Sequence, residues 1–212
     1  MKKILILSLS VLSTLLFSAC TDQANQPESQ AENIIGKHTI RFTEPPKRIP
    51  APHSVDAPLL GNGFTGVALS GTPESQVFYV ARNDFWRLKS ALDESFPLVL
   101  GKIELDIPQL KDASYLVEQQ LYDAVSTSRF TKGDISVSYK AFVPATEDML
   151  IVELNMEGNG SVEGTAGISF LGKEEQIDNP PRERIFPDVR EHETRPNGIE
   201  YLSRAFADSV DI

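Results

Sequence analysis

The stretch PLLGNGFTGVALSGTPESQVFYVARNDFWR, residues Pro58 to Arg87, decides the fold of this chain. Its first glycines permit positive φ, so Leu60 to Gly63 is expected to form a tight turn that leads into a strand. That strand is Phe64 to Leu69. After a turn cluster, the β-branched and aromatic residues of Gln76 to Ala81 predict a second strand. Together the two strands predict a β-hairpin.

The end of this stretch carries side chains suited to a sugar. An amide and a carboxylate, Asn83 and Asp84, lie beside Phe85 and Trp86, the only tryptophan of the chain. A flat aromatic ring stacks on the C–H face of a pyranose, while amides and carboxylates hydrogen-bond its hydroxyls. The residues alone favour a structural role. Phe85 and Trp86 would then close the end of a core, with Arg82, Asp84 and Arg87 as a solvated ion cluster.

Further strand-like runs extend on both sides of this stretch, separated by turn signals and without a helical period. Such spacing predicts an all-β, antiparallel β-sandwich. A proline-rich segment before Pro58 is expected to be an extended lead-in, residues 88–96 a short helix or loop, and the charged Glu174 to Asn197 a surface loop. The expected strands are Thr39 to Phe42, Leu98 to Ile107, Tyr115 to Ala124, Val125 to Thr131, Ile135 to Val143, Met149 to Met156, Val162 to Leu171 and Ile199 to Phe206.

The N-terminus has the pattern of an export signal. Lys2 and Lys3 precede an apolar run from Ile4 to Phe17, and Ser18-Ala19-Cys20 resembles a bacterial lipobox. Cys20 is the only cysteine, so no internal disulfide can form, and lipidation of Cys20 explains both its position and the count. Residues 1–19 are therefore predicted to be a lipoprotein signal peptide and residues 20–33 a flexible tether. We expect a protein of the bacterial cell envelope that contacts the membrane only through its lipid.

Charge and motif spacing bear on function. The net charge of −10 at pH 7 argues against nucleic-acid binding. Glu104 and Asp106 come near the two-carboxylate strand of jelly-roll glucanases, but Gln109 stands where the acid is needed. The three histidines lack metal-ligand spacing, so we expect no metal site. We also expect no cofactor.

The run from Pro58 to Gly71, followed by Phe78 to Arg87, resembles the opening of the N-terminal sandwich domain of six-hairpin glycosidases. The similar proteins are those of glycoside hydrolase family 95, of the α-L-fucosidase type, and of family 65. The resemblance implies a super-sandwich fold over residues 34–212, cut short before an (α/α)6 barrel that would carry the catalytic residues. It implies no catalytic residue in this chain. Asn83, Asp84, Phe85 and Trp86 would form a loop at the rim of the sugar site, with Asn62 nearby.

Two functions are consistent with these features. The first is a non-catalytic N-terminal sandwich domain of a glycoside hydrolase, which packs against the barrel and edges its sugar site. The alternative is a stand-alone surface lipoprotein that binds a glycan or a partner protein. A large exposed apolar surface would favour the first.

Overall fold

The computed structural model describes residues 30–50, 55–87, 96–158, 162–171, 188–196 and 198–206. The expected signal peptide, Cys20 and most of the tether lie outside these residues, as do residues 88–95 and most of the charged segment after Glu174. The elements are α1 (Gln30–Ile35), β1 (Thr39–Phe42), β2 (Leu59–Gly61), β3 (Thr65–Thr72), β4 (Ser75–Arg87), β5 (Phe96–Asp106), η2 (Pro108–Leu110), β6 (Ser114–Gln120), β7 (Val125–Lys132), β8 (Ile135–Phe142), β9 (Ile151–Glu157), β10 (Thr165–Ser169), β11 (Asp188–Thr194) and β12 (Glu200–Phe206).

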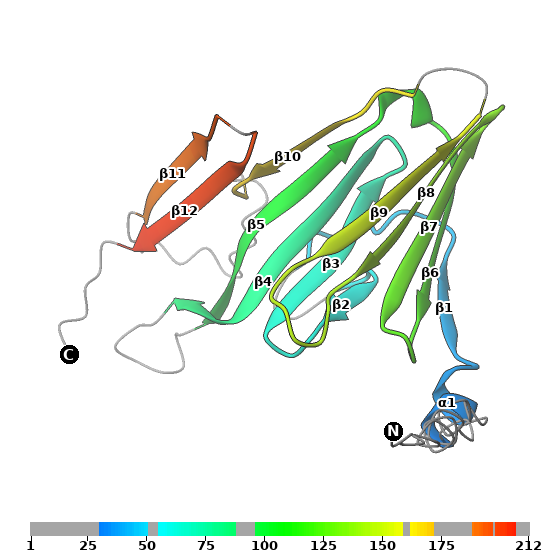
Figure 1. Cartoon of the computed structure of the whole chain (residues 1–212), viewed down its shortest axis with the longest axis horizontal. Helices are drawn as coiled ribbons and strands as arrows, with labels where there is room; N and C mark the ends of the chain where they lie inside the picture. The colour runs from blue at the N-terminus through cyan, green and yellow to red at the C-terminus, as the bar shows by residue number, and fades with distance from the viewer. Residues whose placement is uncertain are drawn as a thin grey trace, which may run out of the picture.

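Two five-stranded antiparallel sheets pack face to face, which confirms the predicted all-β sandwich (Figure 1). Sheet A has the strand order β1-β6-β7-β8-β9 and sheet B the order β10-β5-β4-β3-β2. The hairpin of β11 and β12 forms a separate two-stranded sheet next to β10, where Glu200 accepts a hydrogen bond from the amide of Ile168 at 3.2 Å.

The core lies between the sheets because alternate residues of each strand point inward. Phe78 of β4 meets Tyr139 of β8 edge to face, with ring centroids 5.6 Å apart. The buried side chains of this core are Leu60, Val67, Leu69, Phe78, Ile107, Leu110, Val117, Phe130, Val137, Tyr139, Ala141 and Val143.

A smaller apolar cluster covers the outer face of sheet B. Ala68 of β3 and Tyr79 of β4 are buried there against Ala57, with Ile49 packed on them. The segment before β2, expected as an extended lead-in, therefore contributes to packing on the outside of the sandwich.

The predicted hairpin is confirmed, with corrections at its ends. β3 and β4 pair in register from Thr65 opposite Arg82 to Thr72 opposite Ser75. β4, however, continues through Arg87, so the segment expected to be a rim loop is extended strand. Because Asn83 and Asp84 are polar, the sequence predicts that the strand ends before them. In the structure, hydrogen bonds from Asn83 to residues 63–64 hold this segment in extended form.

Other boundaries also differ from the predictions: Leu60 and Gly61, expected in a tight turn, belong to β2, and β10 is shorter than the expected strand. β6 ends at Gln120, and residues 121–124 form a turn in which Ala124 has a φ of 53°. Asp188–Thr194, expected within a surface loop, is β11. It is a charged strand that pairs only with β12 among the described strands. Gln30–Ile35 forms an exposed helical turn, where a flexible tether was expected to continue to residue 33.

Candidate functional site

Asn62 joins two loops at one end of the sandwich. Its side-chain oxygen accepts hydrogen bonds from the amides of Phe64 and Thr65 at 2.9 and 2.8 Å. Its amide nitrogen donates to the carbonyls of Pro144 and Glu147, each at 3.2 Å, in the loop between β8 and β9. This amide has two donors and two acceptor sites, and the protein uses all of them. The structure therefore gives Asn62, expected near a sugar, a structural role.

Arg82 organises the charges at the same end. Its guanidinium donates to both carboxylate oxygens of Asp84, at 3.0 and 3.2 Å, and to Asp148 at 3.1 Å. It also stacks over the ring of Phe64 at 4.6 Å from the centroid. The hydrogen bond from Arg82 holds the pKa of Asp84 below its usual range, although desolvation acts in the opposite direction. At neutral pH Asp84 is thus a carboxylate that can accept hydrogen bonds, and it cannot serve as a general acid.

Trp86 is held in a fixed orientation while its ring faces solvent. The indole Nε1 donates to the backbone carbonyl of Asn83 at 2.6 Å, and 44% of the residue is exposed. Asn83 in turn donates from its side chain to the carbonyl of Gly63 at 2.8 Å. The register between β4 and β5 shifts between Ala81 and Trp86, so this segment bulges from the ladder. Bulges of this kind aim side chains next to binding sites.

Phe85 lies apart from these residues. It lines an apolar pocket of about 250 Å³ formed by strands β4, β5, β10 and β12. The structure therefore brings Asn62, Asn83, Asp84 and Trp86 to one end of the sandwich, whereas Phe85 takes the packing role that the sequence offered as an alternative. The other lining residues are Val80, Leu100, Gly101, Lys102, Ile103, Ile168, Phe170 and Leu202.

The carboxylates of β5 are engaged by neighbours. Glu104 pairs with Lys102 at 2.9 Å and accepts a hydrogen bond from the hydroxyl of Ser169 at 2.9 Å. Asp106 accepts a hydrogen bond from the hydroxyl of Ser75 at 2.5 Å. These contacts explain both side chains as parts of the sheet surface.

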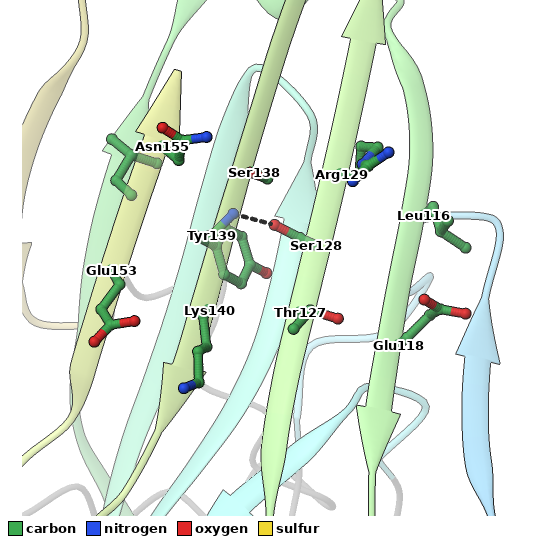
Figure 2. A pocket seen from close by; sticks show the side chains of 11 residues that line it. Leu116, Glu118, Thr127, Ser128, Arg129, Ser138, Tyr139, Lys140, Glu153 and Asn155 are labelled. Atoms are coloured by element: carbon green, nitrogen blue, oxygen red, sulfur yellow. Dashed lines mark hydrogen bonds between the residues drawn. The ribbon is translucent and has the colours of Figure 1, made fainter. Parts of the chain in front are cut away.

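Sequence reasoning missed a groove of about 560 Å³ on the outer face of sheet A (Figure 2). It crosses strands β6 to β9, and its polar side chains alternate with residues that point into the core. The signal was present as period-two alternation, in which Thr127 and Arg129 share one face of β7 and Ser138 and Lys140 one face of β8. The lining residues are Leu116, Glu118, Thr127, Ser128, Arg129, Ser138, Tyr139, Lys140, Glu153, Leu154 and Asn155.

The fold is an all-β sandwich that exposes polar and aromatic side chains at one end and a polar groove on sheet A. Comparison of the sequence with protein-family models gives no match, and comparison with curated proteins gives none either. In the part of the chain that the structure describes, no helix has the length and apolarity needed to cross a bilayer.

Proposed function

We propose that this chain is a non-catalytic sandwich domain of a glycan-processing protein, and that it contacts carbohydrate at the end that carries Trp86. The observation that carries the proposal is the indole of Trp86, which is half exposed and fixed by its hydrogen bond to Asn83. A ring that is already oriented loses little conformational entropy when a pyranose stacks on it.

Asp84 supplies the polar partner that an aromatic platform needs. Its side chain is 52% exposed, and Arg82 holds it as a carboxylate through two hydrogen bonds. The remaining lone pairs of that carboxylate can accept hydrogen bonds from sugar hydroxyls. A stacking ring and an oriented acceptor two residues apart on β4 form a small sugar-binding subsite.

Exposed apolar side chains on β9 support the view that a further domain packs against the sandwich. Leu154 and Met156 are 38% and 46% exposed, although their ladder partners Tyr139 and Val137 point into the core. Apolar side chains on the inner face of sheet A thus remain exposed at its β9 edge, where no described residue covers them. By the resemblance, that further domain is an (α/α)6 barrel, and a lipid on Cys20 anchors the protein in the cell envelope.

Trp86 is the only tryptophan, so its fluorescence reports directly on the proposed subsite. We would titrate the full chain with a panel of neutral oligosaccharides and follow emission. A saturable emission shift in the parent chain, together with calorimetrically measured binding that is lost in Trp86→Ala, supports the proposal. Tyr201→Ala is the matched control, because Tyr201 is equally exposed, at 45%, on β12. An unchanged affinity in Trp86→Ala, or no response to any saccharide, would overturn the proposal.

A further inference from the structure

The groove on the outer face of sheet A consists of two complete rows of side chains across four strands. Cross-strand register places Leu116, Arg129, Ser138 and Asn155 in one row. The second row contains Glu118, Thr127, Lys140 and Glu153, and β1 extends it with Arg41. Figure 2 shows the polar side chains of both rows standing on one face of the sheet.

Two positively charged side chains, Arg129 and Lys140, lie at the centre of the groove. Arg129 has Leu116 and Ser138 as its ladder neighbours, and among the described residues its guanidinium makes no hydrogen bond or ion pair. Glu118, the acidic residue of β6 in the groove, is occupied by Arg41, with a 2.6 Å ion pair. In a chain of net charge −10, an arginine without a carboxylate partner on a hollowed sheet face is a candidate ligand-binding group.

Lys140 lies diagonally from Arg129, and hydroxyl side chains complete the centre. Lys140 is opposite Thr127 on one side and Glu153 on the other, without an ion pair to Glu153 among the described contacts, and Arg129 is opposite Ser138. The described contact of the Lys140 ammonium is with the face of Phe142, 5.4 Å from the ring centroid. An anion held here would receive a planar guanidinium fork from one strand and an ammonium from the next.

Two buried residues form the floor of the groove. Tyr139 and Ser128 lie beneath it, where the backbone amide of Tyr139 donates to the Ser128 hydroxyl at 3.2 Å. The Tyr139 ring points away into the core and is only 3% exposed. β7 and β8 are paired on both sides, so their edges are closed to an added peptide strand. A ligand lying over β7 and β8 would therefore meet side chains and not free backbone groups.

We infer that this groove binds an acidic oligosaccharide, whose carboxylate or sulfate group is held by Arg129 and Lys140. Thr127, Ser138, Asn155 and Glu153 then meet the sugar hydroxyls, since hydroxyl, amide and carboxylate groups suit such partners. The groove offers few large apolar side chains, which disfavours a protein partner, because protein interfaces depend on aromatic and aliphatic anchors. This inference goes beyond the proposed function and rests on different residues, on the opposite sheet from Trp86.

The test is calorimetric titration of the full chain with an oligogalacturonate, a sulfated dextran oligomer and neutral dextran of similar length. Binding of either acidic probe, and not of neutral dextran, is expected, and the stronger one identifies the preferred anion. Removing both cations in Arg129→Ala/Lys140→Ala should weaken that binding by about a hundredfold, or about tenfold for each charge-assisted contact. Raising the salt concentration should also weaken it.

Lys111→Ala is the matched control, because it removes one exposed positive charge outside the groove. It should leave affinity within about twofold, and Trp86→Ala should do the same, which separates this site from the proposed sugar subsite. Ser138→Trp fills the groove without altering its charge, and it should abolish binding while the far-ultraviolet circular dichroism and the thermal midpoint of the fold are kept. Equal affinity in the double variant, equal binding of single-stranded DNA or polyglutamate, or no binding of either acidic sugar would overturn the inference.

Discussion

The phenol of Tyr139 in β8 donates a hydrogen bond to the side-chain carbonyl of Gln76 in β4, at 3.3 Å, across the interior of the sandwich. Both residues are buried, with exposures of 3% and 2%. The Gln76 amide also donates to the backbone carbonyl of Thr72 in the hairpin. This polar link ties the two sheets together across the core.

Tyr139→Phe should lower the free energy of unfolding by about 1–3 kcal/mol, because it leaves the buried Gln76 carbonyl without a donor. The double variant Tyr139→Phe/Gln76→Leu should recover part of that loss, since it removes both polar partners. Urea denaturation of the two variants and the parent chain measures the difference. A single variant as stable as the parent would show that the carbonyl finds another partner.

Alkaline pH should destabilise the protein through buried tyrosines. Burial raises the pKa of Tyr115 to about 12, and that of Tyr139 is raised further by the same cause. In the unfolded chain these phenols ionise near the ordinary tyrosine pKa of 10, so their contribution to stability is complete below pH 10. Stability should fall as pH rises from 10 towards 12. Denaturant midpoints at pH 8, 10 and 11 measure this loss, which should be smaller in Tyr115→Phe.

Asn62→Ala should lower the free energy of unfolding by about 2 kcal/mol or more, because it leaves backbone groups in two loops without their partners. Asn155→Ala is the control. Asn155 is exposed, and its amide bonds only to Glu157, at 3.0 Å, among the described contacts. A change of less than about 0.5 kcal/mol is expected there. Similar thermal shifts in both variants would contradict the structural role of Asn62.

Acid titration should detect the ion pair of Arg82 with Asp84. The pKa of Asp84 is lowered from 3.8 in the folded protein, so the pair stabilises the fold above that pH. The stabilisation is lost as pH falls through the lower folded value. NMR titration of the Asp84 carboxyl should give a midpoint below 3.8, and Arg82→Met should raise it. A midpoint that does not respond to Arg82→Met would disprove the pairing.

Gly71→Ala should be far more destabilising than Gly133→Ala. Both glycines have positive φ, 90° and 56°, but an added Cβ at Gly71 would collide with the backbone of Ser75, whereas the space around Gly133 is open. We expect about 1 kcal/mol for Gly133→Ala from the backbone conformation alone. Gly71→Ala should prevent correct formation of the hairpin turn, which circular dichroism and thermal unfolding would detect. Equal effects would show that the turn can rearrange.

Sequence patterns predicted the sandwich because its strands alternate apolar and polar residues between clear turns. They failed where polar side chains occupy extended backbone. Asn83 and Asp84 look like the end of a strand, yet contacts with residues 63–64 keep them in β4. β11 was missed because DVREHET has no apolar alternation, and pairing with β12 alone supports it.

The candidate site could be predicted only in part. The exposure of Trp86 and the ionic contact of Asp84 with Arg82 depend on nearby residues, but both residues lie in β4 and not in the loop that the resemblance implied. The structural role of Asn62 depends on residues 144–148, more than eighty positions away. The groove depends on the register of four neighbouring strands. Alternation within one strand shows which residues share a face, but it does not show which residues lie opposite them on the next strand.

The side chain of Gln119 in β6 makes two hydrogen bonds to the backbone of Leu59, donating to its carbonyl at 2.5 Å and accepting from its amide at 3.3 Å. Leu59 belongs to β2, the outermost strand of sheet B. An open strand edge is a template on which a second molecule can add its own strand and begin a fibril. A single glutamine therefore occupies the amide and carbonyl of Leu59, so an added strand could not pair with those two groups while the contact is made.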